Sequence, residues 1–208
     1  MDLIERARAL YEGVDAAHDF DHVLRVLALV RHIGPREGAD MRLLEAATLL
    51  HDIARGEEAR SGVDHALAGA ERARAIVREW GYSEEEAEAI ATAIAAHRFR
   101  NDRHPATIEA QVLYDADKLD ALGAAGIGRA FAFAGRTGQA LWRPVPEGAC
   151  ATQPVDPSRH SPNIEFAVKL SRLADSMHTA TARALAGERH AYMVAFFQRL
   201  EEEVRGER

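Results

Sequence analysis

The stretch AATLLHDIA, residues 46–54, sets an adjacent histidine and aspartate, His51 and Asp52, in an otherwise apolar run. Apolar residues recur here at the three-to-four spacing of one helix face, so we predict a helix over about 41–54 with Asp40 as its N-terminal cap. An ionised carboxylate among apolar neighbours costs several kcal/mol unless it is paired or binds a cation. Asp52 therefore needs a partner of opposite charge.

Two further stretches place similar residues on apolar helices. HDFDHVLRV, residues 18–26, contains His22, and VLYDADKLDALG, residues 112–123, contains Asp117. A single histidine within a helix usually has a structural role. A histidine, a His-Asp pair and an aspartate on three apolar helices are better explained together, by one bound cation. Two imidazoles and two carboxylates, with no thiolate, suit Mn²⁺, Fe²⁺, Co²⁺, Ni²⁺ or Zn²⁺ better than Ca²⁺.

Helical periodicity recurs along most of the chain, and no stretch alternates with period two for long enough to predict a strand. We expect an all-α fold in one domain, 1–208, with a metal-binding core at about 16–134 and C-terminal helices at about 162–205. Between them, a Pro- and Gly-rich loop at about 135–161 is long enough to be functional, and it is expected to line or cover a pocket. The expected helices cover about 2–12, 16–33, 41–54, 65–80, 84–97, 105–121 with a further segment to about 134, 162–186 and 188–205. Gly34-Pro35 is expected to end the second of them.

The composition excludes several classes of protein. Lys and Arg number 26 against 33 Asp and Glu, so the formal charge of −7 argues against broad binding to nucleic acid or to an anionic membrane. The single cysteine, Cys150, allows no internal disulfide, and the charged N-terminus is unlike a signal peptide. No apolar run reaches the ~20 residues of a membrane span. We expect a cytoplasmic protein and leave homodimer formation open.

Three motifs carry a resemblance to a known family. They are HDFDHVLRV (18–26), LLHDIAR (49–55) and DADKLDALG (115–123). They resemble the motifs of the HD-domain superfamily of metal-dependent phosphohydrolases. AIAAHRFR (93–100), GIGRAFAFAG (126–135) and the C-terminal tail are similar to a bacterial branch that includes nucleoside triphosphate pyrophosphohydrolases, so the likeness covers roughly residues 14–203.

The resemblance implies that His22, His51, Asp52 and Asp117 bind a divalent transition metal. It also implies hydrolysis of nucleoside triphosphates to monophosphate and pyrophosphate by a metal-activated water, with Asp52 both ligand and catalytic residue. The alternatives are a phosphomonoesterase or phosphodiesterase on the same site, or a nucleotide- or metal-binding module without turnover. His22 is chosen over His18 because the family pattern places a ligand three residues before an Arg-Val pair.

The surrounding polar residues have several candidate roles. His18, one turn before His22, is a candidate proton donor or phosphate contact, with a structural role as the alternative. His65 and His97 either bind phosphate or hold a second metal, as in some HD proteins, and the resembling branch favours a single metal. Asp120, one turn after Asp117, is a candidate general base or partner of a ligand, or a surface carboxylate paired with lysine. The candidate cations for the phosphates are Arg25, Arg55, Arg98, Arg100 and Lys118, of which Lys118 is also a catalytic candidate.

Overall fold

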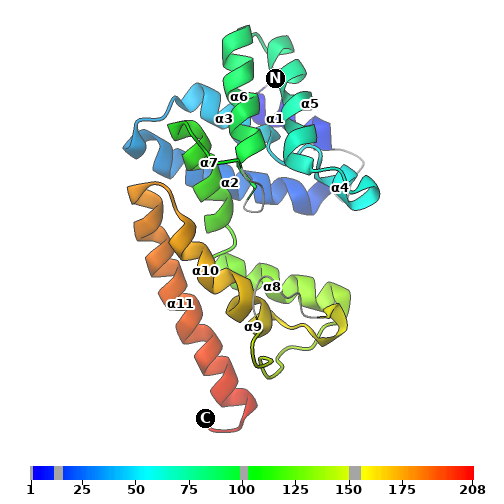
Figure 1. The fold of residues 1–208 in the computed structure, drawn as a ribbon, viewed down its shortest axis with the longest axis vertical. Helices are drawn as coiled ribbons and strands as arrows, with labels where there is room; N and C mark the ends of the chain where they lie inside the picture. Colours follow the sequence, from blue (N-terminus) through cyan, green and yellow to red (C-terminus); the bar gives the residue numbers. More distant parts are fainter. Residues whose placement is uncertain (1, 12–15, 99–102, 150–155) are drawn as a thin grey trace. The chain divides into compact units, whose positions relative to one another are not determined.

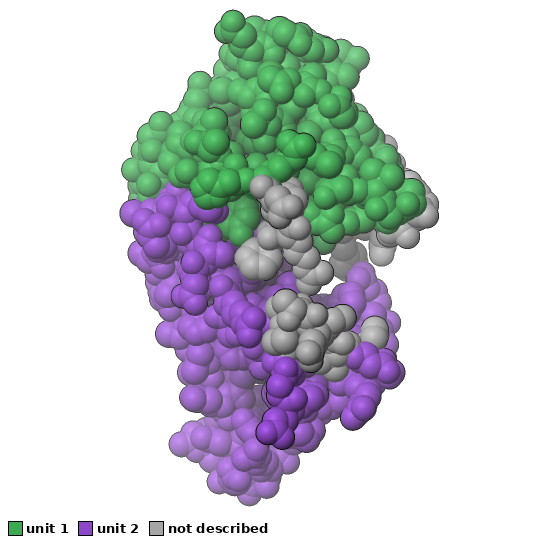
Figure 2. All heavy atoms as spheres, viewed as in Figure 1, with its two compact units in different colours: residues 1–117 green, residues 118–208 purple. Residues whose placement is uncertain are grey.

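The computed structural model describes residues 2–11, 16–98, 103–149 and 156–208 (Figure 1). Within these residues it contains helices and turns and no strand, which confirms the all-α prediction. None of the described helices combines the length and hydropathy that a membrane span requires. The chain divides into two compact units, residues 1–117 and residues 118–208 (Figure 2).

The first unit is a helical bundle around an aliphatic core. Its elements are α1 (Leu3–Arg8), a 3₁₀ turn (Ala9–Tyr11), α2 (Ala16–Glu37), α3 (Met41–Leu50), α4 (Arg55–Ser61), α5 (His65–Glu79), α6 (Glu84–Ala96) and most of α7 (Ile108–Leu119). α3 packs against α2 and α6, and α5 packs along α6. The core side chains Leu44, Leu49, Leu50 and Ile94 are fully buried, so α3 is anchored on several sides and the residues after it are held in place.

Side chains cap the N-termini of α3 and α6, and the Asp40 cap of α3 was predicted. Asp40 accepts hydrogen bonds from the backbone N–H groups of Arg42 and Leu43 at the start of α3. Ser83 and Glu86 form a capping box at the start of α6, each side chain accepting from the other's backbone N–H.

The predicted helix over 41–54 is too long. α3 ends at Leu50, and the next residues form a turn that leads into α4, which was not predicted. The Ile53 N–H bonds to the Leu50 carbonyl and the Arg55 N–H to the Asp52 carbonyl, both at the three-residue spacing of a tighter turn. His51 and Asp52 therefore lie on a turn at the end of the helix.

The predicted stop at Gly34-Pro35 is wrong. α2 runs through Pro35 to Glu37, so the proline removes one backbone hydrogen bond from the last turns without ending the helix. The helix is closed instead by Gly38, whose φ of +74° is left-handed, and the Ala39 N–H bonds to the Gly34 carbonyl at 3.0 Å. This is the pattern of a Schellman motif.

The second unit contains α8 (Gly123–Thr137), a 3₁₀ turn (Pro157–Arg159), α9 (Pro162–Glu165), a π-helical turn (Phe166–Leu170), α10 (Ser171–Leu173), a second 3₁₀ turn (Ala174–Ser176) and α11 (Ala180–Val204). α8 packs against α9 and α11. Its C-terminus extends three residues into the predicted loop, to Thr137, and is capped by Gly138, which has a φ of +69°. Part of that loop, residues 150–155 with Cys150, lies outside the described residues.

The predicted break between the C-terminal helices is also misplaced. We expected it near residue 187, but Gly187 lies inside α11. The break comes at Met177, which is extended, and Thr179 caps α11 by accepting from the Ala182 N–H. A capping threonine after an extended residue ends one helix and begins the next, whereas a lone glycine within a long helix is tolerated.

Candidate metal centre

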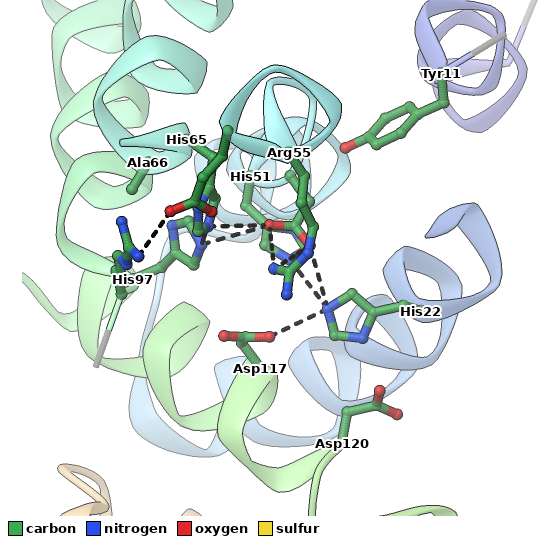
Figure 3. Close-up of polar contacts among 12 residues, drawn as sticks. Tyr11, His22, His51, Arg55, His65, Ala66, His97, Asp117 and Asp120 are labelled. Carbon is green, nitrogen blue, oxygen red and sulfur yellow. Dashed lines mark hydrogen bonds and ion pairs between the residues drawn. The ribbon is translucent and has the colours of Figure 1, made fainter. Parts of the chain in front are cut away.

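The four predicted ligands of the first unit come from three segments. His22 lies on α2, His51 and Asp52 lie on the turn after α3, and Asp117 lies near the end of α7. Figure 3 shows that His22 and Asp117 point toward the turn that carries His51. The structure therefore brings the four residues together, as their apolar surroundings predicted.

The distances between their polar atoms are short. His22 Nε2 lies 3.4 Å from His51 Nε2 and 3.1 Å from Asp117 Oδ1. Asp52 Oδ2 lies 3.8 Å from the Nε2 atoms of both His22 and His51. Two ligand atoms that are each about 2.1 Å from one ion, at right or tetrahedral angles, lie about 3.0–3.4 Å apart. The spacing and the mixed donor set therefore fit one divalent transition metal, to which His22, His51 and Asp52 each offer one atom.

Hydrogen bonding fixes the tautomer of His51. Its Nδ1 lies 2.7 Å from the carbonyl oxygen of Thr48 on the preceding turn of α3. A carbonyl only accepts, so Nδ1 carries the proton and the electron pair of Nε2 faces His22 and Asp52. A backbone carbonyl behind a histidine is a common way to orient a metal ligand.

Burial and charge set the protonation states of the His-Asp pair. His51 is fully buried, and this burial lowers its pKa from 6.5 to about 4, although Asp52 opposes the shift. Burial alone would raise the pKa of the Asp52 carboxyl, but His51, His97 and Arg55 outweigh it and hold the pKa well below its usual value. A neutral imidazole and an ionised carboxylate are the forms that bind a metal, so the pair is ready for one at neutral pH.

A second group shares Asp52. Its other oxygen, Oδ1, lies 3.5 Å from His65 Nε2 and 3.7 Å from His97 Nε2, and the two Nε2 atoms are 3.3 Å apart. All three residues are buried, and together they also form a group that could hold a metal. Burial lowers the pKa of His65, with Asp52 opposing. Asp52 thus turns one carboxylate oxygen toward each group.

The predicted cations near these groups have different surroundings. Arg55, half exposed, reaches both carboxylate oxygens of Asp52 at 3.1 and 3.3 Å. Arg25 is half-buried on α2, three residues after His22. The Arg98 guanidinium forms ion pairs with Glu58 and Asp64 at 2.7 and 3.0 Å. Arg100 lies outside the described residues.

Of three further predicted residues, one has a side chain outside the described part of the chain and two belong to the second unit. His18 belongs to α2, but its side chain lies outside the described part of the chain. Lys118 follows Asp117 on α7, is half-buried and opens the second unit. Asp120 is buried in that unit and accepts a hydrogen bond from Arg129 at 2.6 Å, so it is not a surface carboxylate. The roles expected of these residues toward a substrate stay predictions.

Sequence reasoning missed Glu58. Its Oε2 lies 2.7 Å from His65 Nδ1, and its other oxygen takes the bond from Arg98. The segment that carries it, RGEEARS, has no apolar periodicity, so neither α4 nor an inward-facing acid on it was expected. The spacing of seven residues before a histidine is too common to be a signal.

Comparison with known proteins agrees with this geometry. The HD domain family matches residues 19–122. The chain is 35% identical over 202 residues to YpgQ of Bacillus subtilis (strain 168), covering 92% of this chain and 86% of YpgQ. Among solved structures, an HD-superfamily hydrolase from Bacillus thuringiensis superposes with a TM-score of 0.77 at 30% identity, covering 98% of this chain and 95% of that one. YpgQ in complex with ADP superposes with a TM-score of 0.73 at 33% identity, covering 97% and 94%.

The family match, the fold and the positions of the clustered residues agree. The matched region contains the His22, His51-Asp52 and Asp117 positions, and the superpositions extend over nearly the whole chain. The chain belongs to the HD domain family and is a metal-dependent phosphohydrolase of the HD superfamily.

Proposed function

We propose that this enzyme hydrolyses nucleoside triphosphates to monophosphate and pyrophosphate, with one divalent metal held by His22, His51, Asp52 and Asp117. The observation that carries the proposal is the convergence of two imidazoles and two carboxylates, all but Asp117 buried, at separations of 3.1–3.8 Å. The ADP bound to YpgQ supports a nucleotide as the ligand, since the two chains are 33% identical over nearly their full lengths.

The chemistry follows from the donor set. When bound, a divalent metal lowers the pKa of water and polarises a phosphoryl group. The oxygen of a water molecule forms a bond with the α-phosphorus, the α–β bridging P–O bond breaks, the proton of the water passes to solvent, and pyrophosphate leaves with the bridging oxygen. His51 remains neutral and Asp52 ionised throughout, because their pKa values lie far below neutral pH.

Nearby arginines supply positive charge for the phosphates. Arg55 has half of its side chain exposed and pairs with the Asp52 carboxylate, which a metal would also engage. The planar array of donors on a guanidinium is well suited to a phosphate oxygen. Arg25, on the same helix as His22, is the second candidate.

The test is a product assay on metal-stripped protein to which Mn²⁺ or Co²⁺ is returned. The substrates are nucleoside tri-, di- and monophosphates and cyclic nucleotides, and the products are separated by chromatography. We expect monophosphate and pyrophosphate from triphosphates, and no turnover by His51→Ala or Asp52→Ala. His32→Ala, which changes an exposed histidine of α2, is the matched control and should retain activity.

Other outcomes would replace this proposal. Orthophosphate from monophosphates, or opening of cyclic nucleotides, would indicate a phosphomonoesterase or phosphodiesterase on the same site. Thermal stabilisation by a nucleotide without any product over hours, with metal content verified, would indicate a binding module. Full activity in both alanine variants would refute the proposed site.

A further inference from the structure

Tyr11, at the end of the first 3₁₀ turn, contacts both helices that lead to the metal ligands. Its ring packs edge-on against the ring of Phe20 on α2, with the centroids 5.2 Å apart. Its hydroxyl donates a hydrogen bond to the Leu49 carbonyl on α3 at 3.1 Å, and Figure 3 shows it pointing toward the segment that carries His51. Phe20 lies two residues before His22, and Leu49 lies two residues before His51. One side chain therefore links the two backbone segments from which these ligands extend.

The hydroxyl of Tyr11 acts on the end of α3. In a helix that continued, the Leu49 carbonyl would accept from the N–H of Ile53. The Ile53 N–H instead donates to the Leu50 carbonyl at 3.2 Å, at the three-residue spacing of a tighter turn. Leu49 is fully buried, and a buried carbonyl without a donor costs free energy. Tyr11 thus replaces the helical donor and favours the turn that follows Leu50.

This turn sets the directions of His51 and Asp52. The chain rotates by about 100° per residue in an α-helix and by about 120° at three-residue spacing, so the two paths diverge by roughly 20° per residue. For side-chain atoms about 5–6 Å from the helix axis, 20° is a movement of roughly 2 Å. A metal tolerates only ~0.2 Å in its ligand distances. Whether the chain turns or continues as helix after Leu50 therefore decides whether His51 and Asp52 meet His22.

The Tyr11 ring is held firmly enough to fix its hydroxyl. Tyr11 is 5% exposed and Phe20 is 1% exposed. Arg8, from the same N-terminal segment, places its guanidinium over the Phe20 ring at 4.4 Å from the centroid. Because two side chains of this segment engage Phe20, the position of the Tyr11 hydroxyl is referred to α2 while it bonds to α3.

We propose that Tyr11 is a positioning residue of the metal site. With its ring on α2 and its hydroxyl on α3, it holds His22 in register with the turn that carries His51 and Asp52, so that the three can bind one divalent cation. The inference goes beyond the proposed function, which concerns the substrate and the groups that touch it. It rests on that proposal only in taking these residues as metal ligands, and its test contains no substrate.

The experiment measures binding of the metal alone. Metal-free protein is titrated with Mn²⁺ by equilibrium dialysis, and with Co²⁺, whose visible absorption reports the number and arrangement of its ligands. Tyr11→Phe keeps the ring on Phe20 and removes only the hydroxyl. It should weaken Mn²⁺ binding by about 10-fold, as loss of a group that orients ligands does, and should change the Co²⁺ spectrum. Tyr11→Leu, which also removes the ring, should weaken binding further.

The matched control is Tyr82→Phe. The Tyr82 hydroxyl donates to the Arg42 carbonyl at 3.2 Å, at the other end of α3. This variant removes the same kind of bond from the same helix, far along it from His51. It should keep the Mn²⁺ affinity and the Co²⁺ spectrum of the wild type. Urea denaturation of the metal-free variants shows how much each loses in general stability.

A rescue variant tests the hydrogen bond itself. Para-aminophenylalanine in place of Tyr11 presents an N–H donor from the same ring position. It should restore most of the Mn²⁺ affinity that Tyr11→Phe loses, whereas a role of Tyr11 in packing alone would give no such recovery.

The outcomes separate this inference from the proposed function. Wild-type affinity and spectrum in Tyr11→Phe would overturn the inference, whatever the enzyme hydrolyses. An equal loss of affinity in Tyr82→Phe would also overturn it, because the effect would then be one on α3 as a whole. Weakened metal binding in Tyr11→Phe alone, in a protein that releases no pyrophosphate from nucleotides, would support the inference and refute the proposed function. Should Tyr11→Leu fail to fold, Tyr11→Phe and its rescue decide the question.

Discussion

Acidification of the metal-free protein should destabilise it mainly through His51. Burial lowers the pKa of this imidazole from 6.5 to about 4 in the folded protein. Between these two pH values the unfolded chain binds a proton that the folded chain does not. The free energy of unfolding therefore falls as the pH falls through this window. The pKa difference of 6.5 − 4 = 2.5 units corresponds to about 3 kcal/mol at the acid limit.

Urea denaturation in excess chelator, at pH 7 and pH 4.5, measures this contribution. Between the two pH values, the free energy of unfolding of the wild type should fall by about 2 kcal/mol more than that of His51→Asn. Most of the effect of the pKa difference is already present at pH 4.5. Asp52 does not interfere in this window, because its pKa lies well below its usual value and the carboxylate stays ionised. His32→Asn, at an exposed position of α2, should follow the wild type.

The reasoning fails if the wild type and His51→Asn lose the same stability on acidification. The buried imidazole would then titrate alike in both states, and the neutral ligand inferred for the metal site would be wrong. A second check uses Mn²⁺, which binds only the folded protein. At 100 times its dissociation constant it should add about 2.7 kcal/mol at pH 7, and less at pH 4.5, where protons compete for the histidines.

Three predictions concern the second unit, each measured by urea denaturation at pH 7. Arg129→Met should lower the free energy of unfolding by about 1–3 kcal/mol, because it removes the partly exposed partner of the buried Asp120 carboxylate. An unchanged urea midpoint would mean that other contacts satisfy the carboxylate. Gly123→Ala should cost about 1–2 kcal/mol, because Gly123 has a φ of +71° and a Cβ there would lie 3.0 Å from Arg189 Cγ. Arg189→Met should cost about 1 kcal/mol, because it removes the 2.6 Å bond to the Leu119 carbonyl at the end of α7, and Arg189→Lys should cost less.

The sequence was informative wherever a polar residue interrupted an apolar pattern. His22, His51 and Asp52 could be selected because each stands in a run whose other residues build the core, and the structure buries all three. The ends of helices were harder to predict, because the same residue type has different effects at different positions in a helix. Pro35 does not end α2 and Gly187 does not interrupt α11, whereas Gly38 ends α2 by adopting a positive φ.

The outer frame of the cluster could not be predicted, for a physical reason. Glu58 looks like one of several solvated acids in RGEEARS, and nothing in its own surroundings marks it as buried or paired. Its role depends on a turn: Gly62, with a φ of +72°, closes α4 and reverses the chain, so that α5 begins with His65 beside the acid. A histidine's chemistry depends on which nitrogen keeps its proton, and here that is decided by an acceptor from a separate helix. A sequence pattern can therefore identify the residues that face a metal, but it does not identify the groups that orient their side chains.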